Sequence, residues 1–269
     1  MEELLTRLGV GQTTLTVGAL VAARIAPLTV FAPWLTLRRT PPIIRGSLIV
    51  ALTVALTPLA LTSAGSAVDS VGPLVFGAMA LREALVGTLF AVATALPLYA
   101  LDWSGRLVDT WRGASLAEVI APPTGERTSP LGDLYLMMGV VLFLTLGGHR
   151  VAFAAFADAL VVAPVGDVNL VGGAGTVAFG AARLSASALA FATSVAAPMA
   201  VAIVVVEMSL GLIARSAPQV PVFFAGMPLR AATGLGAALA GLSLLVGQLP
   251  EVFSTAIEIA RDWVSGIQP

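Results

Sequence analysis

The side chains that could do chemistry in this sequence are ionisable groups placed inside otherwise apolar segments. These groups are Arg24, Arg82, Glu83, Asp133, Asp158, Arg183 and Glu207. A charge near the middle of a membrane costs several kcal/mol, so it is usually paired with another group or faces water. The groups would therefore carry protons or ions, as in a pump, or have a structural role as ion pairs between helices or as residues near a helix end. We favour the structural role, because no segment has a regular series of carboxylates or arginines.

The sequence offers little that catalysis or metal binding would need. It has no Cys and a single His, His149, so thiolate sites and clusters of histidines are excluded. All 14 basic residues are Arg, which excludes a Schiff-base lysine. No GxSxG sequence surrounds any Ser, and the GxGxxA pattern at 173–178 joins apolar segments instead of a strand and a helix. We expect no enzymatic activity, no cofactor and no metal ion.

The composition is typical of an integral membrane protein. Of the 269 residues, 58% are hydrophobic and 11% are charged, whereas soluble domains average about 25% charged residues. So few charges cannot cover the surface of a soluble globule. The net charge of −1 argues against nucleic-acid binding, because there is no basic surplus to neutralise phosphates.

Several apolar segments reach the length of about 17–25 residues that a membrane-spanning helix needs. They occupy 15–37, 46–68, 72–101, 131–148, 176–206 and 231–250, and a shorter apolar run occupies 151–165. These segments predict an all-α fold, with one membrane-embedded domain over 1–269. Prolines inside the segments, such as Pro58 and Pro198, would kink the helices. Kinked helices favour packing in an assembly, or lining a cavity, over standing as isolated rods in lipid.

The charged connections predict the orientation and the surface of the domain. The turn at 38–45 has three Arg and no acid, which places it in the cytoplasm and the N-terminus outside. The first residues include Glu2 and Glu3 instead of a basic cluster, so we expect no cleaved signal peptide.

Two polar stretches are expected to lie outside the spans. The long loop 102–130 has two Trp, mixed charges and turn sequences, which favour an ordered contact surface. Asp109 and Arg112 have the three-residue spacing of a local pair on a helix. The tail 251–269 contains a predicted amphipathic helix over 251–264, which would lie on the membrane surface or dock on a partner.

Short motifs follow one another in a definite order along the chain. The motif residues that we select as candidates for assembly or gating are Arg24, Pro27, Pro33, Pro41, Arg45, Glu83, Gly87, Asp109, Arg112, Gly113, Pro123, Pro130, Pro164, Pro198, Arg215, Pro218, Phe223, Pro228 and Arg230. In this order and spacing, over 15–250, the chain resembles the T-subunit family of the type III secretion export apparatus, which includes the flagellar FliR protein. The RGA sequence at 112–114 and TGERTSPLG at 124–132 are more similar to the injectisome branch. Val220 and Arg230 stand where the family usually has Asn and Lys.

The resemblance implies a structural subunit of a protein-conducting export gate in the bacterial inner membrane. Such a subunit would be present in one copy, packed with several copies of the small R and S subunits into a closed helical cone. It would also meet the switch/autoprotease subunit, secreted proteins in transit and membrane lipid, and it would have no enzymatic activity. Glu83 and Arg112 are the charges that we expect assembly to need most.

Two other functions stay open at this point. One is the flagellar homologue, which neighbouring genes for hook and rod components would indicate. The other is a secondary transporter, since such proteins use broken helices and charges near the membrane midplane. A transporter of that kind predicts an internal repeat, and the proline spacings in the two halves of this sequence do not match.

Overall fold

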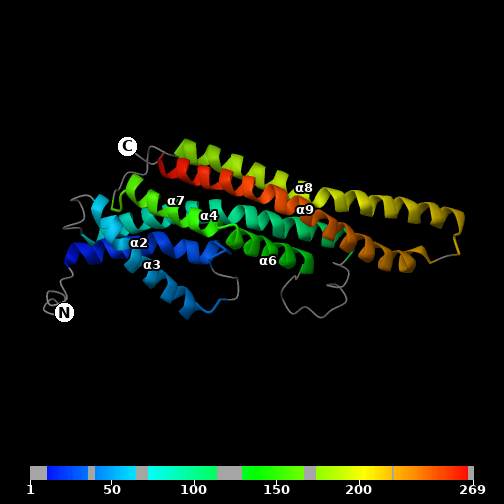
Figure 1. The fold of residues 1–269 in the computed structure, drawn as a ribbon, viewed down its shortest axis with the longest axis horizontal. Helices are drawn as coiled ribbons and strands as arrows, with labels where there is room; N and C mark the ends of the chain where they lie inside the picture. The colour runs from blue at the N-terminus through cyan, green and yellow to red at the C-terminus, as the bar shows by residue number, and fades with distance from the viewer. Residues whose placement is uncertain are drawn as a thin grey trace. The chain divides into compact units, whose positions relative to one another are not determined.

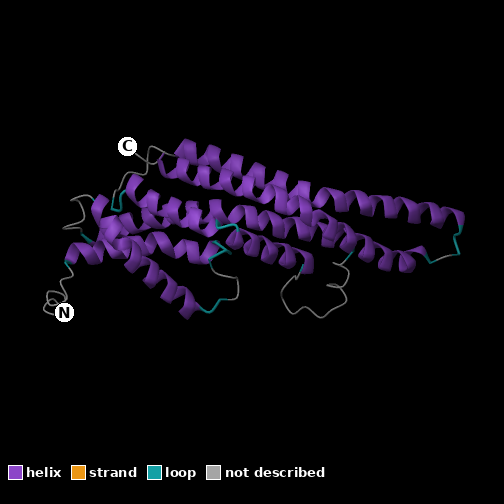
Figure 2. Cartoon of the chain, in the orientation of Figure 1, coloured by secondary structure: helices purple, strands orange, loops and turns teal. Residues whose placement is uncertain are grey.

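The computed structural model describes residues 11–35, 40–64, 72–113, 129–166, 174–219 and 221–265. This part of the chain is helical and contains no strand, which confirms the all-α prediction (Figures 1 and 2). Its helices are α2 (Gln12–Phe31), α3 (Pro42–Ser63), α4 (Pro73–Trp111), α6 (Pro130–Thr145), α7 (Gly148–Val162), α8 (Ala174–Ser216) and α9 (Val222–Ser265). Four of the described helices are long and apolar enough to cross a membrane, and the number is six if each of two bent pairs counts as one span.

Helix α4 is longer than the sequence predicted. It continues to Trp111, so the first part of the expected loop 102–130 is helical, and 114–128 lies outside the described residues. The polar residues of this part are compatible with a helix because their charges pair along it. Arg106 Nε lies 3.0 Å from Asp102 Oδ1, four residues earlier. Apolar residues such as Leu101 and Val108 keep helical spacing and are fully buried.

The chain divides into two compact units. Unit 1 consists of Met1–Leu96, Phe143–Leu184 and Phe253–Pro269, and unit 2 of Pro97–Leu142 and Ser185–Val252. The boundaries fall inside α4, α6, α8 and α9, so each of these helices contributes to both units.

Unit 1 has a hydrophobic core made by helices that are far apart in the sequence. Val21 from α2, Phe90 from α4 and Phe156 from α7 are all buried in it. The rings of Phe90 and Phe156 meet edge to face, with centroids 5.3 Å apart. Helix α2 can pack this way because its apolar residues recur at helical spacing along one side.

The C-terminal tail belongs to this same core. The amphipathic helix predicted over 251–264 is the last part of α9, and its apolar residues Ile257, Ala260 and Trp263 are buried in the core of unit 1. Arg261 NH2 on its polar side lies 3.3 Å from Asp158 Oδ2 on α7. The chain itself therefore covers the apolar face that we expected to meet the membrane surface or a partner.

Unit 2 packs α6 against α8 and α9. The Tyr135 hydroxyl donates to the backbone oxygen of Ala238 over 3.0 Å and lies 3.6 Å from Met199 Sδ. The Ser194 hydroxyl of α8 donates to Gln248 Oε1 of α9 over 2.9 Å. These polar side chains of unit 2 are thus hydrogen-bonded to neighbouring helices, which an apolar surrounding favours.

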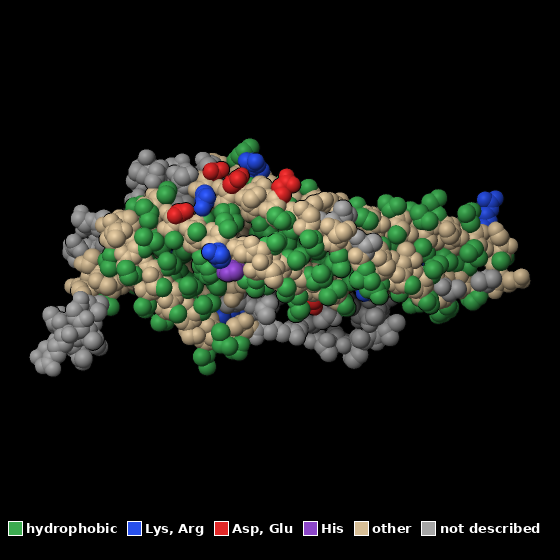
Figure 3. Space-filling view, in the orientation of Figure 1, with side chains coloured by type: hydrophobic (Ala, Val, Ile, Leu, Met, Phe, Trp, Pro, Cys, Tyr) green, Lys and Arg blue, Asp and Glu red, His purple; other side chains and the backbone are tan. Residues whose placement is uncertain are grey.

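The surface of the described residues is largely apolar. Figure 3 shows hydrophobic side chains distributed across the face in view, interspersed with backbone and other side chains, and few charged groups. Large side chains such as Val54 and Met208 are 69% and 67% exposed. An apolar surface of this extent is typical of contact with lipid or with other proteins.

Candidate functional site

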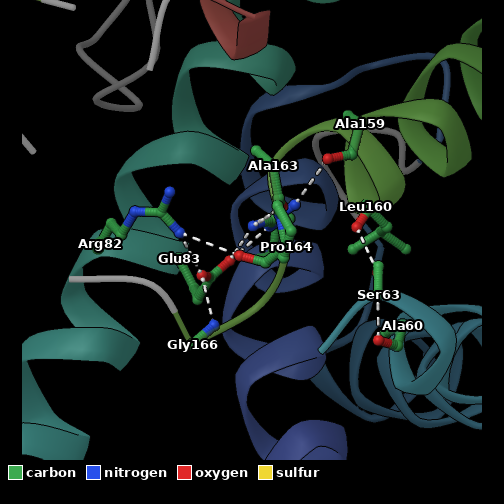
Figure 4. Close-up of polar contacts among 10 residues, drawn as sticks. Ala60, Ser63, Arg82, Glu83, Ala159, Leu160, Ala163, Pro164 and Gly166 are labelled. Atoms are coloured by element: carbon green, nitrogen blue, oxygen red, sulfur yellow. Dashed lines mark hydrogen bonds and ion pairs between the residues drawn. The ribbon is translucent and has the colours of Figure 1, made fainter. Parts of the chain in front are cut away.

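The buried charges of unit 1 form one cluster around Glu83. Arg24 on α2 and Glu83 on α4 have no exposed side-chain surface, and Arg24 NH2 lies 2.5 Å from Glu83 Oε2. Arg82 NH1 donates to Glu83 Oε1 over 3.0 Å. The backbone N–H of Gly166 donates to the same carboxylate oxygen over 3.4 Å (Figure 4). The carboxylate therefore receives hydrogen bonds from three directions.

The two arginines also bind the end of α7. Arg24 donates from NH1 to the backbone oxygen of Ala159 over 3.2 Å and from NH2 to that of Ala163 over 3.0 Å. Arg82 NH1 donates to the backbone oxygen of Pro164 over 3.3 Å (Figure 4). The Ala159 carbonyl also accepts the backbone N–H of Ala163. The C-terminal end of a helix carries partial negative charge, so a guanidinium is favourable there. The Arg24–Glu83–Arg82 cluster thus joins α2, α4 and the chain that leaves α7.

Gly87 allows α4 to come close enough to α2 for this pairing. It lies one helical turn after Glu83, and a Cβ at this position would overlap the backbone carbonyl of Arg24. Any larger residue would push the two helices apart and move the Glu83 carboxylate away from the guanidinium. Glu83 and Gly87 therefore act together, because Gly87 allows the close approach of the helices that the Glu83 ion pair needs.

The geometry of this cluster favours a role in holding helices together over a role in carrying protons. A carrier needs access to water in at least one state, whereas the side chains of Arg24 and Glu83 are fully covered. The ion-pair interpretation is supported here, because the pair joins residues 59 positions apart in the sequence. In the described part of the chain, no group of three or more His, Asp or Glu side chains is placed to hold a metal ion.

A second cluster, in unit 2, fixes the start of α6 on the end of α4. Asp109 Oδ2 accepts from the Ser129 hydroxyl over 2.6 Å and from the Leu131 backbone N–H over 3.0 Å. Arg112 Nε donates to Asp109 Oδ1 over 2.7 Å, so the predicted i,i+3 pair is present. The Ser129 hydroxyl accepts from the Gly132 N–H over 3.1 Å, as an N-cap residue does, and Pro130 follows at the first helical position.

Replacing Asp109 with Ala is expected to destabilise unit 2. The variant leaves the Leu131 N–H and the Arg112 guanidinium without their carboxylate, and a hydrogen bond to a charged group is worth about 1.5–3 kcal/mol. We expect a lower unfolding midpoint in detergent solution. The matched control is Asp133→Ala, because Asp133 is exposed in the first turn of α6 and supplies only a dipole interaction of about 0.3–1 kcal/mol. Equal midpoints for the two variants would contradict the role given to Asp109.

Residues 15–256 match the family described as bacterial export proteins, family 1. The match covers most of the chain, including both charge clusters. The chain belongs to this family. The expected resemblance to the T-subunit and FliR proteins is confirmed by the relatives that follow.

Relatives of this export-protein family member include proteins of flagella and of secretion systems. The flagellar biosynthetic protein FliR of Bacillus subtilis is 26% identical over 184 residues, which are 68% of this chain and 71% of that protein. The Yop proteins translocation protein T of Yersinia pestis is 30% identical over 151 residues, 56% of this chain and 58% of that protein. FliR of Escherichia coli is 25% identical over 246 residues, 90% of each chain.

The remaining ionisable groups in the apolar segments of this chain are exposed. Glu207 pairs with Arg230 between α8 and α9, and its side chain is 43% exposed. Asp158 is 66% exposed in its pair with Arg261. Asp133 and Arg183 are exposed as well. Each of these four groups lies on the outward side of its helix, which an apolar sequence neighbourhood does not reveal.

The structure gathers some of the predicted site residues and leaves others apart. Unit 1 brings together Arg24, Glu83, Gly87 and Pro164. Unit 2 brings together Asp109, Arg112 and Pro130. Gly113 lies in the turn directly after α4 and has a φ of 77°. The other described residues take no part in these clusters: Pro27 lies inside α2, Pro33 in the buried turn after it, Pro41 and Arg45 at the start of α3, Pro198 and Pro228 inside α8 and α9, Arg215 exposed in the last turn of α8, and Pro218 on the exposed turn that follows α8. Phe223 lies in the first turn of α9 and its side chain is not described, and Pro123 lies outside the described residues.

Some partners in the clusters were not selected from the sequence. The role of Ser129 was readable from its place directly before Pro130, which is an N-cap signal. Nothing in the sequence indicated that the carbonyl groups of Ala159, Ala163 and Pro164 would bind the arginines. Every residue has a carbonyl, and only the packing of the helices decides which ones meet a guanidinium.

Proposed function

We propose that this chain is a structural subunit of the protein-conducting export gate of a type III secretion system. It would help to form and gate the entry channel for unfolded substrates in the bacterial inner membrane. Membership of the bacterial export family over 15–256 supports this function most directly. The relative from Yersinia is named as a translocation protein, which agrees with export of proteins.

Helix surfaces that stay exposed in the single chain support a place in an assembly. On α8, Val201, Val204, Val205 and Met208 are all more than half exposed. Surfaces of this kind are stable only when other apolar groups cover them. We propose that several copies of the R and S subunits cover them around one copy of this chain, with the switch/autoprotease subunit near by.

Deletion of the gene, followed by complementation, tests the proposed export function. We expect the deletion strain to lose secretion of needle and effector proteins into the medium, and a plasmid copy with an affinity tag to restore it. The tagged chain should copurify with the R and S subunits from solubilised membranes. Unchanged secretion in the deletion strain, together with purification of the chain alone, would overturn the proposal.

The flagellar function is a second candidate, favoured by the match to FliR of Escherichia coli over 90% of each chain. The same deletion strain distinguishes the two. Loss of swimming motility and of extracellular flagellin, with secretion of effectors intact, would assign the chain to the flagellum. The injectisome predicts the opposite pair of results. We favour the injectisome because of the RGA and TGERTSPLG sequences.

We also propose that the N-terminus lies in the periplasm. The three arginines at 38–45 support this orientation through the preference of basic connections for the cytoplasm. Because the chain has no native Cys, a Cys introduced at Glu3 can be probed in intact cells with a membrane-impermeant maleimide. Labelling before lysis supports the orientation, and labelling only after lysis contradicts it.

A further inference from the structure

Helix α3 differs from the other long apolar helices in how little of it the chain covers. Only 6% of the 18-residue apolar stretch of α3 is buried, whereas the buried share of the corresponding stretch is 44% in α2, 61% in α4 and 33% in α8. Its buried residues are Thr57 and Ala60, on the side where α3 packs on α2 and α7. Ile49, Leu52 and Leu56 pack against the core in part, and the opposite side of the helix faces outward from unit 1.

The outward side of α3 is apolar and has no charged residue between Gly46 and Ser63. Ile43, Val50 and Val54 are 84%, 63% and 69% exposed. The inward side is apolar as well, with Leu52 and Leu56 packed against the core. A surface helix that meets water has a polar face, whereas a helix that is apolar all round is buried in protein or lies in a membrane.

The few hydroxyls on the outward side need no external partner. Ser47 donates to the backbone oxygen of Ile44 over 2.9 Å, and Thr62 donates to that of Leu59 over 2.7 Å. In hydrocarbon, an unsatisfied polar group costs several kcal/mol, so hydroxyls must be paired within the protein. These two groups already meet that condition without water.

The length and the charged end of α3 also match a bilayer. Its 22 residues extend over about 33 Å at 1.5 Å per residue, close to a hydrocarbon thickness of about 30 Å. Its first turn carries Arg45, and the segment 38–45 has three Arg and no acid. Basic residues directly beside a span are complementary to the anionic headgroups of the cytoplasmic leaflet.

We infer that α3 is a lipid-facing anchor of this chain, with its outward side in contact with acyl chains and its Arg45 end at anionic headgroups. The exposed part of α8 contrasts with it, because that part carries the half-exposed carboxylate of Glu207. A carboxylate open to hydrocarbon is costly, so the exposed part of α8 is less suited to lipid than α3 is. The inference depends on the membrane location in the proposed function and not on export itself.

Site-directed spin labelling tests the inference, and the absence of native Cys makes each label unique. Single Cys residues are introduced as Val54→Cys and Ile43→Cys on α3, with Ile25→Cys in the core of unit 1 as the buried reference. The labelled chain is incorporated, in the complex with which it copurifies, into vesicles of phosphatidylethanolamine and phosphatidylglycerol. Collision rates with oxygen, which partitions into lipid, and with a nickel chelate, which stays in water, are measured for each label.

We expect the Val54 label to show several-fold more collisions with oxygen than the Ile25 label, and few with the nickel chelate. The Ile43 label, near the headgroups, should collide with the nickel chelate several-fold more often than the Val54 label. Low collision rates with both reagents at Val54 would show that protein covers α3, and frequent nickel collisions would show water there. Either result overturns the inference.

The outcome can be separated from that of the proposed function. Copurification and secretion are measured for each Cys variant, so a variant can support export while its label contradicts the lipid contact. If the Val54→Cys chain does not accumulate, Val50→Cys offers a second outward position on the same helix, 63% exposed.

Discussion

Replacing Glu83 with Gln is expected to destabilise unit 1 by about 3–5 kcal/mol, the usual cost of removing one partner of a buried ion pair. The substitution keeps the size of the side chain and removes its charge. Arg24 and Arg82 would then stay buried beside each other without the carboxylate that both of them contact. The Arg24 contacts with the end of α7 do not offset this loss, because carbonyl groups carry only partial charge.

The measurement for Glu83→Gln has two parts. The unfolding midpoint of the purified chain in detergent should fall sharply, and the amount of chain that accumulates in membranes and secretion through the complex should fall with it. Glu207→Gln is the matched control, since Glu207 also pairs with an arginine, Arg230, but is 43% exposed. An exposed pair is worth about 0–1 kcal/mol, so its midpoint should change little. Similar midpoints for the two variants would show that the Arg24–Glu83–Arg82 cluster does not stabilise the fold.

A double variant distinguishes the stability that comes from the Arg24–Glu83 ion pair from the stability that each side chain contributes by itself. Removing both charges, as Arg24→Gln with Glu83→Gln, leaves a smaller uncompensated charge than removing Glu83 alone. Its loss of stability should therefore be less than the sum of the two single losses. Additive losses would mean that Arg24 and Glu83 act independently.

Replacing Gly87 with Ala is the second change with a large expected effect. The new methyl group would overlap the backbone carbonyl of Arg24, and a backbone carbonyl cannot rotate away as a flexible side chain does. Helices α2 and α4 would have to separate, which costs about 1–3 kcal/mol or more and also lengthens the Arg24–Glu83 contact. We expect a lower unfolding midpoint and reduced copurification with the partner subunits.

Gly77 provides the matched control on the same helix. It is exposed in α4, and a Cβ there would meet nothing within 4 Å. Gly77→Ala should therefore stabilise the helix by about 0.5–1 kcal/mol through its higher helix propensity. The two identical chemical changes are thus expected to have opposite signs. A stabilising effect at both positions would exclude the close approach of α2 and α4 at Gly87.

The helices themselves were largely readable from the sequence. Each predicted apolar segment corresponds to a described helix, because hydrophobic length and helical spacing are local properties. The ends were less accurate, and α4 was predicted to stop at 101 although it continues to Trp111. The polar residues at 102–111 suggested a loop. They are compatible with a helix because charged side chains such as Asp102 and Arg106 pair along it.

The clusters were only partly readable. Arg24 and Glu83 were both selected as candidates, and so were Asp109 and Arg112, which pair three residues apart. That Arg24 contacts Glu83, 59 positions away, and also the end of α7 could not be read from spacing. Contacts at such distances depend on how helices pack, and that packing depends on side chains along their whole length.

The sequence by itself determined the class of this protein. Its scarce charge, its apolar segments and the order of its motifs were sufficient for a helical membrane protein of the export family, because composition and motif order do not depend on coordinates. The tertiary structure alone decided which charges are buried, and it placed Asp158 and Glu207 on the outside while enclosing Glu83. It also decided that the polar-looking tail completes the core through Trp263. The physical reason is that burial depends on how the helices pack together. A residue is covered if another helix packs on its side of its own helix, and it is exposed if none does.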